Sequence, residues 1–211
     1  MAVWTIASEE GTGGARIAAS LAAASDAALL DRSTLALFAR ELNPDFGDGN
    51  GIEERVGGRL NLSALSIAMS TGSDEAFREL RMMRALPELG RTIMRRAAQT
   101  RCVILASAGF AALPDHASAI HVRLRAPLQW RIAAYQREHV VDRRCAEKAI
   151  KHDDHVKHAW VRTLYGLDIN DARNFVVTID ASRVPDDRIV DLLLAAAGVS
   201  ADTPATPAGW A

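Results

Sequence analysis

A glycine-rich turn near the N-terminus has the composition of a phosphate-binding loop. It lies in the stretch TIASEEGTGGARIAASLAAA, which reads as a short apolar strand, a turn and an alanine-rich helix. The amino end of such a helix favours a bound phosphate through its N–H groups and its dipole. The turn residues that could contact a phosphate are Gly11, Thr12, Gly13 and Gly14. The lysine of the GxxxxGKS or GxxxxGKT pattern is absent: Gly14 takes its place, and Arg16 is the first cation after it.

Two carboxylates, Glu9 and Glu10, stand directly before this turn. They would repel a phosphate unless they point away from it or hold a Mg²⁺ ion. Taken alone, the turn therefore favours a structural role over phosphate binding.

Cations are concentrated in the second half of the chain. Residues 121–162 contain ten Lys and Arg against five Asp and Glu, which favours an anionic ligand, although long solvated helices also collect such residues. Within this segment Lys151, Asp154 and Lys157 recur every three residues, so a helix would carry the carboxylate between two cations. This pattern is either a surface ladder of ion pairs or part of a lid whose cations neutralise phosphates.

The same segment holds three histidines, His152, His155 and His158, beside two aspartates. Such a group could bind a divalent metal. However, His152 and His158 would lie about 120° apart around a helix, which favours an exposed polar face, and we expect no protein metal site. The two cysteines are far apart and suggest neither a disulfide framework nor a zinc site.

Short apolar runs alternate with helical patterns along the chain. Four runs predict buried strands: Val3–Ile6, Cys102–Leu105, Ile120–Leu124 and Phe175–Ile179. Helices are predicted over residues 15–24, 32–42, 74–86, 88–99, 127–138, 142–164 and 186–197. Strands separated by helices predict an α/β fold with a parallel sheet covered on both faces. The Gly-, Asn- and Asp-rich segment 43–58 predicts a loop, and Asp142 and Asp186 are predicted helix caps.

Length and composition place this fold in one domain. The chain has 211 residues, of which 49% are apolar, and we expect a domain over 1–198 with a flexible tail at 199–211. The net charge of −1 gives no global field, so we expect neither nucleic acid nor a membrane as partner. With two separated cysteines and no long apolar segment, we expect a cytoplasmic protein.

Several of these segments together resemble the cytidylate kinase-like family of P-loop nucleoside monophosphate kinases. The resemblance is carried in order by TIASEEGTGGARIA, LLDRSTL, RCVILASAG, APLQWRI, AIKHDDHVKHAWVRTLYGLD and NFVVTIDASRV. It implies a P-loop NTPase-type parallel sheet flanked by helices. It also implies a helical lid at 127–166 and a nucleotide-monophosphate-binding insert at 32–100.

The resemblance also implies an activity and the residues that perform it. A nucleotide kinase would move the γ-phosphoryl group of ATP, with Mg²⁺, to a nucleoside monophosphate, with CMP or dCMP favoured. Gly11, Thr12, Gly13, Gly14 and Arg16 would hold the donor phosphates without a loop lysine. Asp31 and Arg32 match the acceptor side. The residues that would act on the transferred group are Arg131, Arg137, Lys151, Asp154 and Lys157. Positioning and electrostatics can carry this reaction without a catalytic base.

Departures from the family pattern keep a second hypothesis open. Arginines usual in the family are replaced by Ser8, Ala15 and Ser107. A nucleotide-binding or regulatory protein that has lost catalysis is therefore the alternative. A metal-dependent protein using the three histidines is a third hypothesis, and the sequence does not indicate an oligomeric state.

Overall fold

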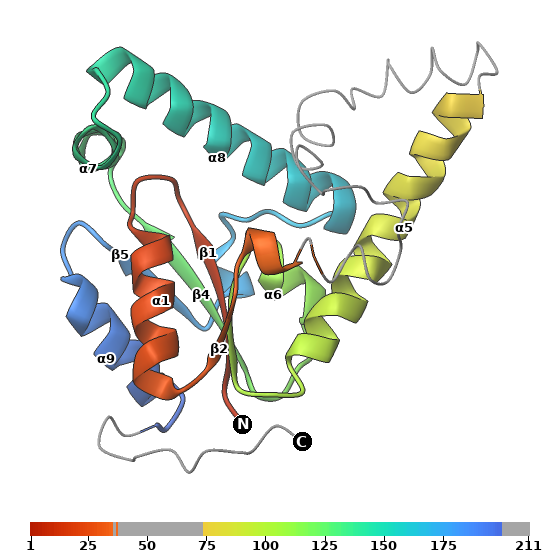
Figure 1. Cartoon of the computed structure of the whole chain (residues 1–211), viewed down its shortest axis with the longest axis horizontal. Coiled ribbons are helices and arrows are strands. Elements are labelled where there is room, and N and C mark those ends of the chain that lie inside the picture. The colour runs from red at the N-terminus through yellow and green to blue at the C-terminus, as the bar shows by residue number, and fades with distance from the viewer. Residues whose placement is uncertain (36, 38–73, 200–211) are drawn as a thin grey trace.

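A five-stranded parallel sheet forms the centre of the part of the chain that the structure describes. The computed structural model describes residues 1–35, 37 and 74–199 (Figure 1). The strands are β1 (Val3–Ser8), β2 (Ala28–Leu30), β3 (Cys102–Leu105), β4 (Ala119–Arg125) and β5 (Val177–Asp180). Their order in the sheet is β2-β3-β1-β4-β5, and all pairs are parallel. The predicted α/β class is therefore confirmed.

The strands form where apolar and β-branched residues are continuous. Val3, Trp4 and Ile6 of β1 are fully buried, as expected of a central strand covered on both faces. The short edge strand β2 was not predicted, because it has three residues and only Leu30 is buried. Strand β5 begins at Val177 instead of the predicted Phe175.

Helices cover both faces of the sheet (Figure 1). Helices α1 (Gly14–Ser25) and α9 (Asp186–Ala196) contact each other on one face. Helices α5 (Asp74–Ala97) and α6 (Gly109–Ala112) lie on the other. The core beneath α1 and α9 includes Trp4, Ile6, Ile17, Leu21, Leu124, Ile189 and Leu193. The core beneath α5 and α6 includes Val3, Met94, Cys102, Ile104 and Leu113.

Two further helices, α7 (Leu128–His139) and α8 (Arg143–Tyr165), lie above the carboxyl edge of the sheet in Figure 1 and occupy the predicted lid range. Asp142 caps α8 as predicted, because its side chain accepts the Cys145 N–H at 2.8 Å. Gly166 ends the helix with φ 69°. A single 3₁₀ turn (Ala172–Asn174) precedes β5.

Two local predictions differ from the structure. The predicted helices 74–86 and 88–99 form the single helix α5, which continues through Pro87. Buried side chains on both sides of the proline, Leu86 and Ile93, hold the helix together despite the missing N–H. Asp186 was predicted to cap α9, but the cap is Pro185 and no side chain caps this helix.

Part of the predicted insert lies outside the described residues. This applies to most of the predicted helix 32–42, to the predicted loop 43–58, and to the tail beyond residue 199. The boundaries of the insert and of the lid therefore stay predictions. Among the helices of the described chain, none has the length and apolarity needed to cross a membrane.

Candidate phosphate-binding site

The glycine-rich turn connects β1 to α1 at the carboxyl edge of the sheet. Gly11 and Gly13 have φ values of 82° and 77°, in the left-handed region that glycine adopts without strain. A Cβ atom at Gly11 would lie only 2.8 Å from the carbonyl oxygen of Arg131, so the turn also lies tightly against α7. Helix α1 begins at Gly14 with no capping side chain. No capping side chain therefore occupies the first N–H groups of the helix, which can then bind an anion.

The structure gives a physical reason for the missing loop lysine. A Cβ atom at Gly14 would collide with the Oγ and Cβ atoms of Ser8. The space where a lysine stem would leave the helix is thus filled by the last residue of β1. Any cation for a phosphate must reach the turn from elsewhere.

Thr12 is buried, and its hydroxyl closes the turn. Its Oγ1 donates to the carbonyl oxygen of Glu9 at 2.7 Å, and its N–H donates to the same oxygen at 3.2 Å. The Thr12 hydroxyl, predicted to donate to a phosphate, thus stabilises the conformation of the turn in this structure.

A cavity of about 750 Å³ opens beside the turn. Seven of the residues predicted from the sequence line it: Gly11, Gly13, Gly14, Arg16, Asp31, Arg32 and Lys157. They come from the turn, from helix α1, from the segment after β2 and from α8. A site at the carboxyl ends of parallel strands is where open α/β sheets bind ligands.

Lys157 is the cation of α8 that reaches the turn. Its Nζ donates to the carbonyl oxygen of Ser8 at 3.1 Å and lies 3.5 Å from a carboxylate oxygen of Glu10. It also pairs with Asp153 at 2.7 Å, one helical turn earlier. Its side chain is only 18% exposed, so its charge acts in a partly desolvated environment.

Arg16 is the cation of α1 that lies against the turn. A Cβ at Gly13 would collide with its guanidinium group, which therefore rests directly on the loop backbone. The guanidinium donates to Asp186 at 3.2 and 3.3 Å and lies 3.6 Å from Glu138 of α7. More than half of this side chain is exposed, so these pairs are weak.

The carboxylate of Glu9 forms ion pairs with three arginines, which compensate its negative charge. One carboxylate oxygen lies 3.5 Å from nitrogens of both Arg123 and Arg125, and the other lies 3.5 Å from Arg131. The second oxygen also accepts the N–H of Ala126 at 3.1 Å. The Glu9 side chain is 12% exposed. The repulsion expected from the sequence is thus compensated by three positive charges, and that of Glu10 in part by Lys157.

Arg123 is a structural member of this network. It is 2% exposed, and its two terminal nitrogens donate to the carbonyl of Ala7 at 3.4 Å and to Asn170 at 3.3 Å. Burial lowers the pKa of the Arg123 guanidinium from its ordinary value, and the Glu9 carboxylate opposes this shift. Part of the positive excess of residues 121–162 is therefore used inside the protein.

Arg131 connects the turn to α8. Its Nη1 lies 2.8 Å from Asp154 and also donates to the carbonyl of Glu10 at 3.2 Å. Its Nε donates to the carbonyl of Ala126 at 3.0 Å. Arg131 and Asp154 therefore form a partly buried link between the turn and α8, and their predicted action on the transferred group stays a prediction.

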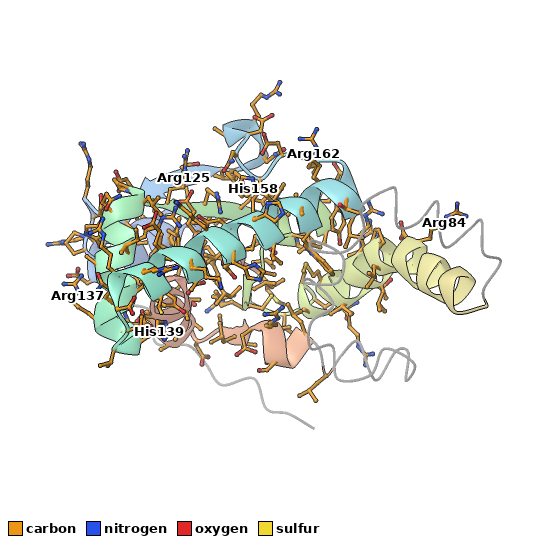
Figure 2. The ribbon with its side chains drawn as sticks, turned by 90° about the horizontal axis from the view of Figure 1, so that it is seen from above. Arg84, Arg125, Arg137, His139, His158 and Arg162 are labelled. Carbon is orange, nitrogen blue, oxygen red and sulfur yellow. The ribbon has the colours of Figure 1, made fainter. Side chains whose placement is uncertain are left out.

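Five predicted residues do not line the cavity: Thr12, Arg131 and Asp154, which are described above, and also Arg137 and Lys151. Arg137 donates to the carbonyl of Ala133 at 3.2 Å on its own helix and is labelled at the outer end of α7 in Figure 2. Lys151 pairs with Glu147 at 2.6 Å on the exposed side of α8. Their predicted contact with the transferred group stays a prediction.

Asp31 serves the backbone after β2. Its Oδ1 accepts from the hydroxyl of Ser33 at 2.6 Å and from the N–H and hydroxyl of Thr34, each at 2.9 Å. The Ser33 hydroxyl is the largest cause of a pKa below the ordinary value for this carboxyl, followed by the Thr34 N–H. Asp31 therefore fixes the segment that carries Arg32 into the cavity wall.

The cavity also contains residues that sequence reasoning did not select. Glu138 and Asp153 line it, as do the substituted positions Ser8, Ala15 and Ser107. Asp153 could have been found, because it stands four residues before Lys157 and pairs with it. Glu138 could not, since nothing local to α7 places it beside Arg16.

Across the described residues, the structure brings together no group of three or more His, Cys, Asp or Glu side chains that could hold a metal ion. The third hypothesis, of a metal-dependent protein that uses the three histidines of α8, stays a hypothesis.

Comparison with known proteins identifies the family. An uncharacterized protein from Eubacterium ventriosum is 15% identical, with a TM-score of 0.64 and coverage of 94% of this chain and 99% of that one. A shikimate kinase from Bacteroides thetaiotaomicron is 10% identical, with a TM-score of 0.48 and coverage of 94% and 99%. No curated protein matches the chain. The profile of the cytidylate kinase-like family matches residues 3–183, and the chain therefore belongs to this family.

Proposed function

We propose that the protein is a nucleotide kinase that transfers the γ-phosphoryl group of ATP to a nucleoside monophosphate, with CMP or dCMP favoured by the family. One observation carries this proposal: a glycine turn and an uncapped helix N-terminus border a cavity that Lys157 enters from α8. Backbone N–H groups and a converging ammonium group are what phosphoryl transfer needs, because its catalysis is mainly positioning and charge stabilisation.

Each cation of the cavity has a distinct role in this proposal. Lys157 takes the part of the loop lysine for which Ser8 leaves no space at Gly14. Arg16 binds donor phosphates after exchanging its exposed partners Asp186 and Glu138, an exchange that costs at most about 1 kcal/mol for each surface pair. Arg32 faces the acceptor from the segment that Asp31 fixes.

The charge balance of the cavity fits a nucleotide that arrives with Mg²⁺. The described residues that line it include three cations, Arg16, Arg32 and Lys157, and five carboxylates: Glu9, Glu10, Asp31, Glu138 and Asp153. Arginines outside the cavity compensate Glu9, but the other four carboxylates still outnumber these cations. A free polyphosphate would gain little net attraction from them, whereas hard carboxylate oxygens suit Mg²⁺ and its bound waters. When bound, the ion would supply charge neutralisation of the phosphate oxygens. The protein's own residues would hold the nucleotide and orient its phosphates.

The alternative is a nucleotide-binding protein of the same fold that has lost turnover. The observation that favours it is that Ser8, Ala15 and Ser107 line the cavity without contributing a cation. Each lost charge at a phosphoryl-transfer site costs a few kcal/mol of transition-state stabilisation, by analogy with other donor deletions.

Turnover with a panel of monophosphates separates the two functions. Purified protein is incubated with Mg-ATP and each of CMP, dCMP, UMP, AMP and GMP, and diphosphate formation is measured alongside ATP affinity. We expect Lys157→Gln to lower kcat/KM by about 10²-fold or more, as for loss of other charged phosphate donors. Lys148→Gln, which removes a charge from the outer side of α8, should have no effect.

The outcomes discriminate cleanly. Diphosphate formation that depends on Lys157 supports the kinase. ATP binding that depends on Lys157, without turnover of any acceptor, supports the alternative. Absence of ATP binding refutes both.

A further inference from the structure

The outward side of α8 carries a row of basic residues with no acidic residue among them. Its members follow each other at alternating intervals of four and three residues, and we call them the basic stripe: Arg144, Lys148, Lys151, His155, His158 and Arg162. At 100° per residue these six positions fall within about 80° of the helix circumference. At 1.5 Å per residue the stripe is about 27 Å long.

Burial shows that the basic stripe faces solvent. Ala146, Ile150, Val156 and Val161 are the buried residues of α8, and they lie on the other side of the helix. Five members of the stripe are exposed and His158 is half-buried. Figure 2 looks down on this side of the molecule, with α8 crossing the view and His158 and Arg162 labelled along it.

The basic stripe is separate from the candidate phosphate-binding site. Lys157 and Asp153, which line the cavity, project from the opposite side of α8. A nucleotide in the cavity therefore cannot be the ligand of the stripe in this arrangement. The stripe needs its own explanation.

Most of its charges are uncompensated within the described chain. Lys151 pairs with Glu147. None of the other five side chains forms an ion pair with a described carboxylate. An ordinary solvated helix face mixes both signs of charge, which relieves repulsion between neighbouring turns. The stripe has four Lys and Arg charges, and Glu147 at its edge pairs with Lys151 alone. An anionic partner would neutralise the charges of Arg144, Lys148 and Arg162.

The composition of the stripe selects the class of partner. It contains no aromatic or aliphatic side chain that could form the apolar centre of a protein interface or insert into a lipid surface. A line of cations without such residues fits regularly spaced phosphates, which are bound by charge and without reading of bases. We propose that the basic stripe binds the phosphodiester backbone of a nucleic acid. The net charge of −1 led us to expect no such partner, because it averages over the whole chain and does not show that positive charge is concentrated on one side of α8.

Salt dependence gives a quantitative test. Binding of fluorescently labelled mixed-sequence DNA duplex is followed by anisotropy between about 50 and 200 mM salt, with RNA duplex and single-stranded DNA as parallel arms. The four Lys and Arg of the stripe predict a slope of log K against log salt of about −3.6 for duplex DNA. The variant R144Q/K148Q should reduce the slope to about −1.8. Neither residue belongs to the candidate phosphate-binding site.

A matched control removes two exposed arginines elsewhere. In R183Q/R188Q both charges come from the β5–α9 region and should leave the slope unchanged. Thermal unfolding verifies that both variants are folded. The inference is overturned if no nucleic acid binds at the lowest salt, or if R144Q/K148Q leaves the slope unchanged or lowers it no more than the control. Binding only to anionic vesicles or to an acidic protein would equally overturn it. A smaller slope of log K against log salt for R144Q/K148Q with DNA or with RNA supports the inference, and the arm in which it occurs identifies the nucleic acid.

Discussion

Replacing Glu9 by glutamine tests whether the arginine network holds the glycine turn. The change keeps the shape of the side chain and an oxygen able to accept the N–H of Ala126, but it removes the charge shared by three guanidinium groups. Arg123 and Arg131 would lose their common partner in a buried environment, where their side chains are only 3% and 7% exposed. We therefore expect a loss of stability.

The structure sets the size of this loss. Breaking a buried ion pair by removing one partner costs about 3–5 kcal/mol. Arg125 is half exposed and adds little. Arg123 keeps Asn170, and Arg131 keeps Asp154, so the lower end applies and we expect about 3 kcal/mol. For a chain of this length that corresponds to a decrease in Tm of about 6–12 °C.

Thermal and denaturant unfolding of E9Q beside wild type measure this effect. The matched control is E147Q, which removes the carboxylate from the exposed pair with Lys151 and should leave Tm essentially unchanged. An E9Q protein as stable as wild type would show that the three arginines do not depend on Glu9. The account of how the turn is anchored to β4 and α7 would then be wrong.

Three further predictions concern single positions. Gly14→Lys, which restores the loop lysine, should lower Tm and should not tighten ATP binding in calorimetry, because its Cβ would collide with Ser8. Val140→Gly should raise the free energy of unfolding in denaturant by about 1 kcal/mol, because this exposed β-branched residue has φ 54°. The folded-state pKa of Asp31 lies below its ordinary value of 3.8, so its stabilising contribution is present above that pH and is lost as pH falls through the folded-state pKa. The difference in Tm between wild type and Asp31→Asn should therefore shrink in acid, and a difference that stays constant down to acid pH would contradict this.

The sequence was sufficient to predict the strands and helices that a continuous local pattern of apolar residues indicates. Runs such as Cys102–Leu105 are apolar without interruption, and a buried parallel strand is the simplest structure for them. The strand Ala28–Leu30 was missed because three residues give no period. The continuity of α5 through Pro87 was missed because tertiary packing overrides the local preference of proline.

In the candidate site, too, contacts between residues close in sequence could be predicted, and contacts that depend on the tertiary structure could not. The glycines of the turn are adjacent in sequence, so their proximity could be predicted. The partners of Glu9 could not, because they depend on the register that places Ser8 beside Leu124 and thus brings the end of β4 to the turn. Lys151 and Lys157 are six residues apart, which leaves them about 120° apart around the helix. In the structure Lys157 reaches the turn and Lys151 pairs with Glu147, and the predicted role of Lys151 stays a prediction.

The contact between Ser8 and Gly14 has a consequence for how this loop can change in evolution. Both the Oγ and the Cβ of Ser8 occupy the place of a side chain at position 14, so even alanine at position 8 would leave an obstruction. A lysine at 14 would become sterically accessible only after residue 8 had become glycine, which is costly within a buried parallel strand. The two positions should therefore vary together among relatives. A route from this loop to a lysine-bearing one passes through a less stable intermediate.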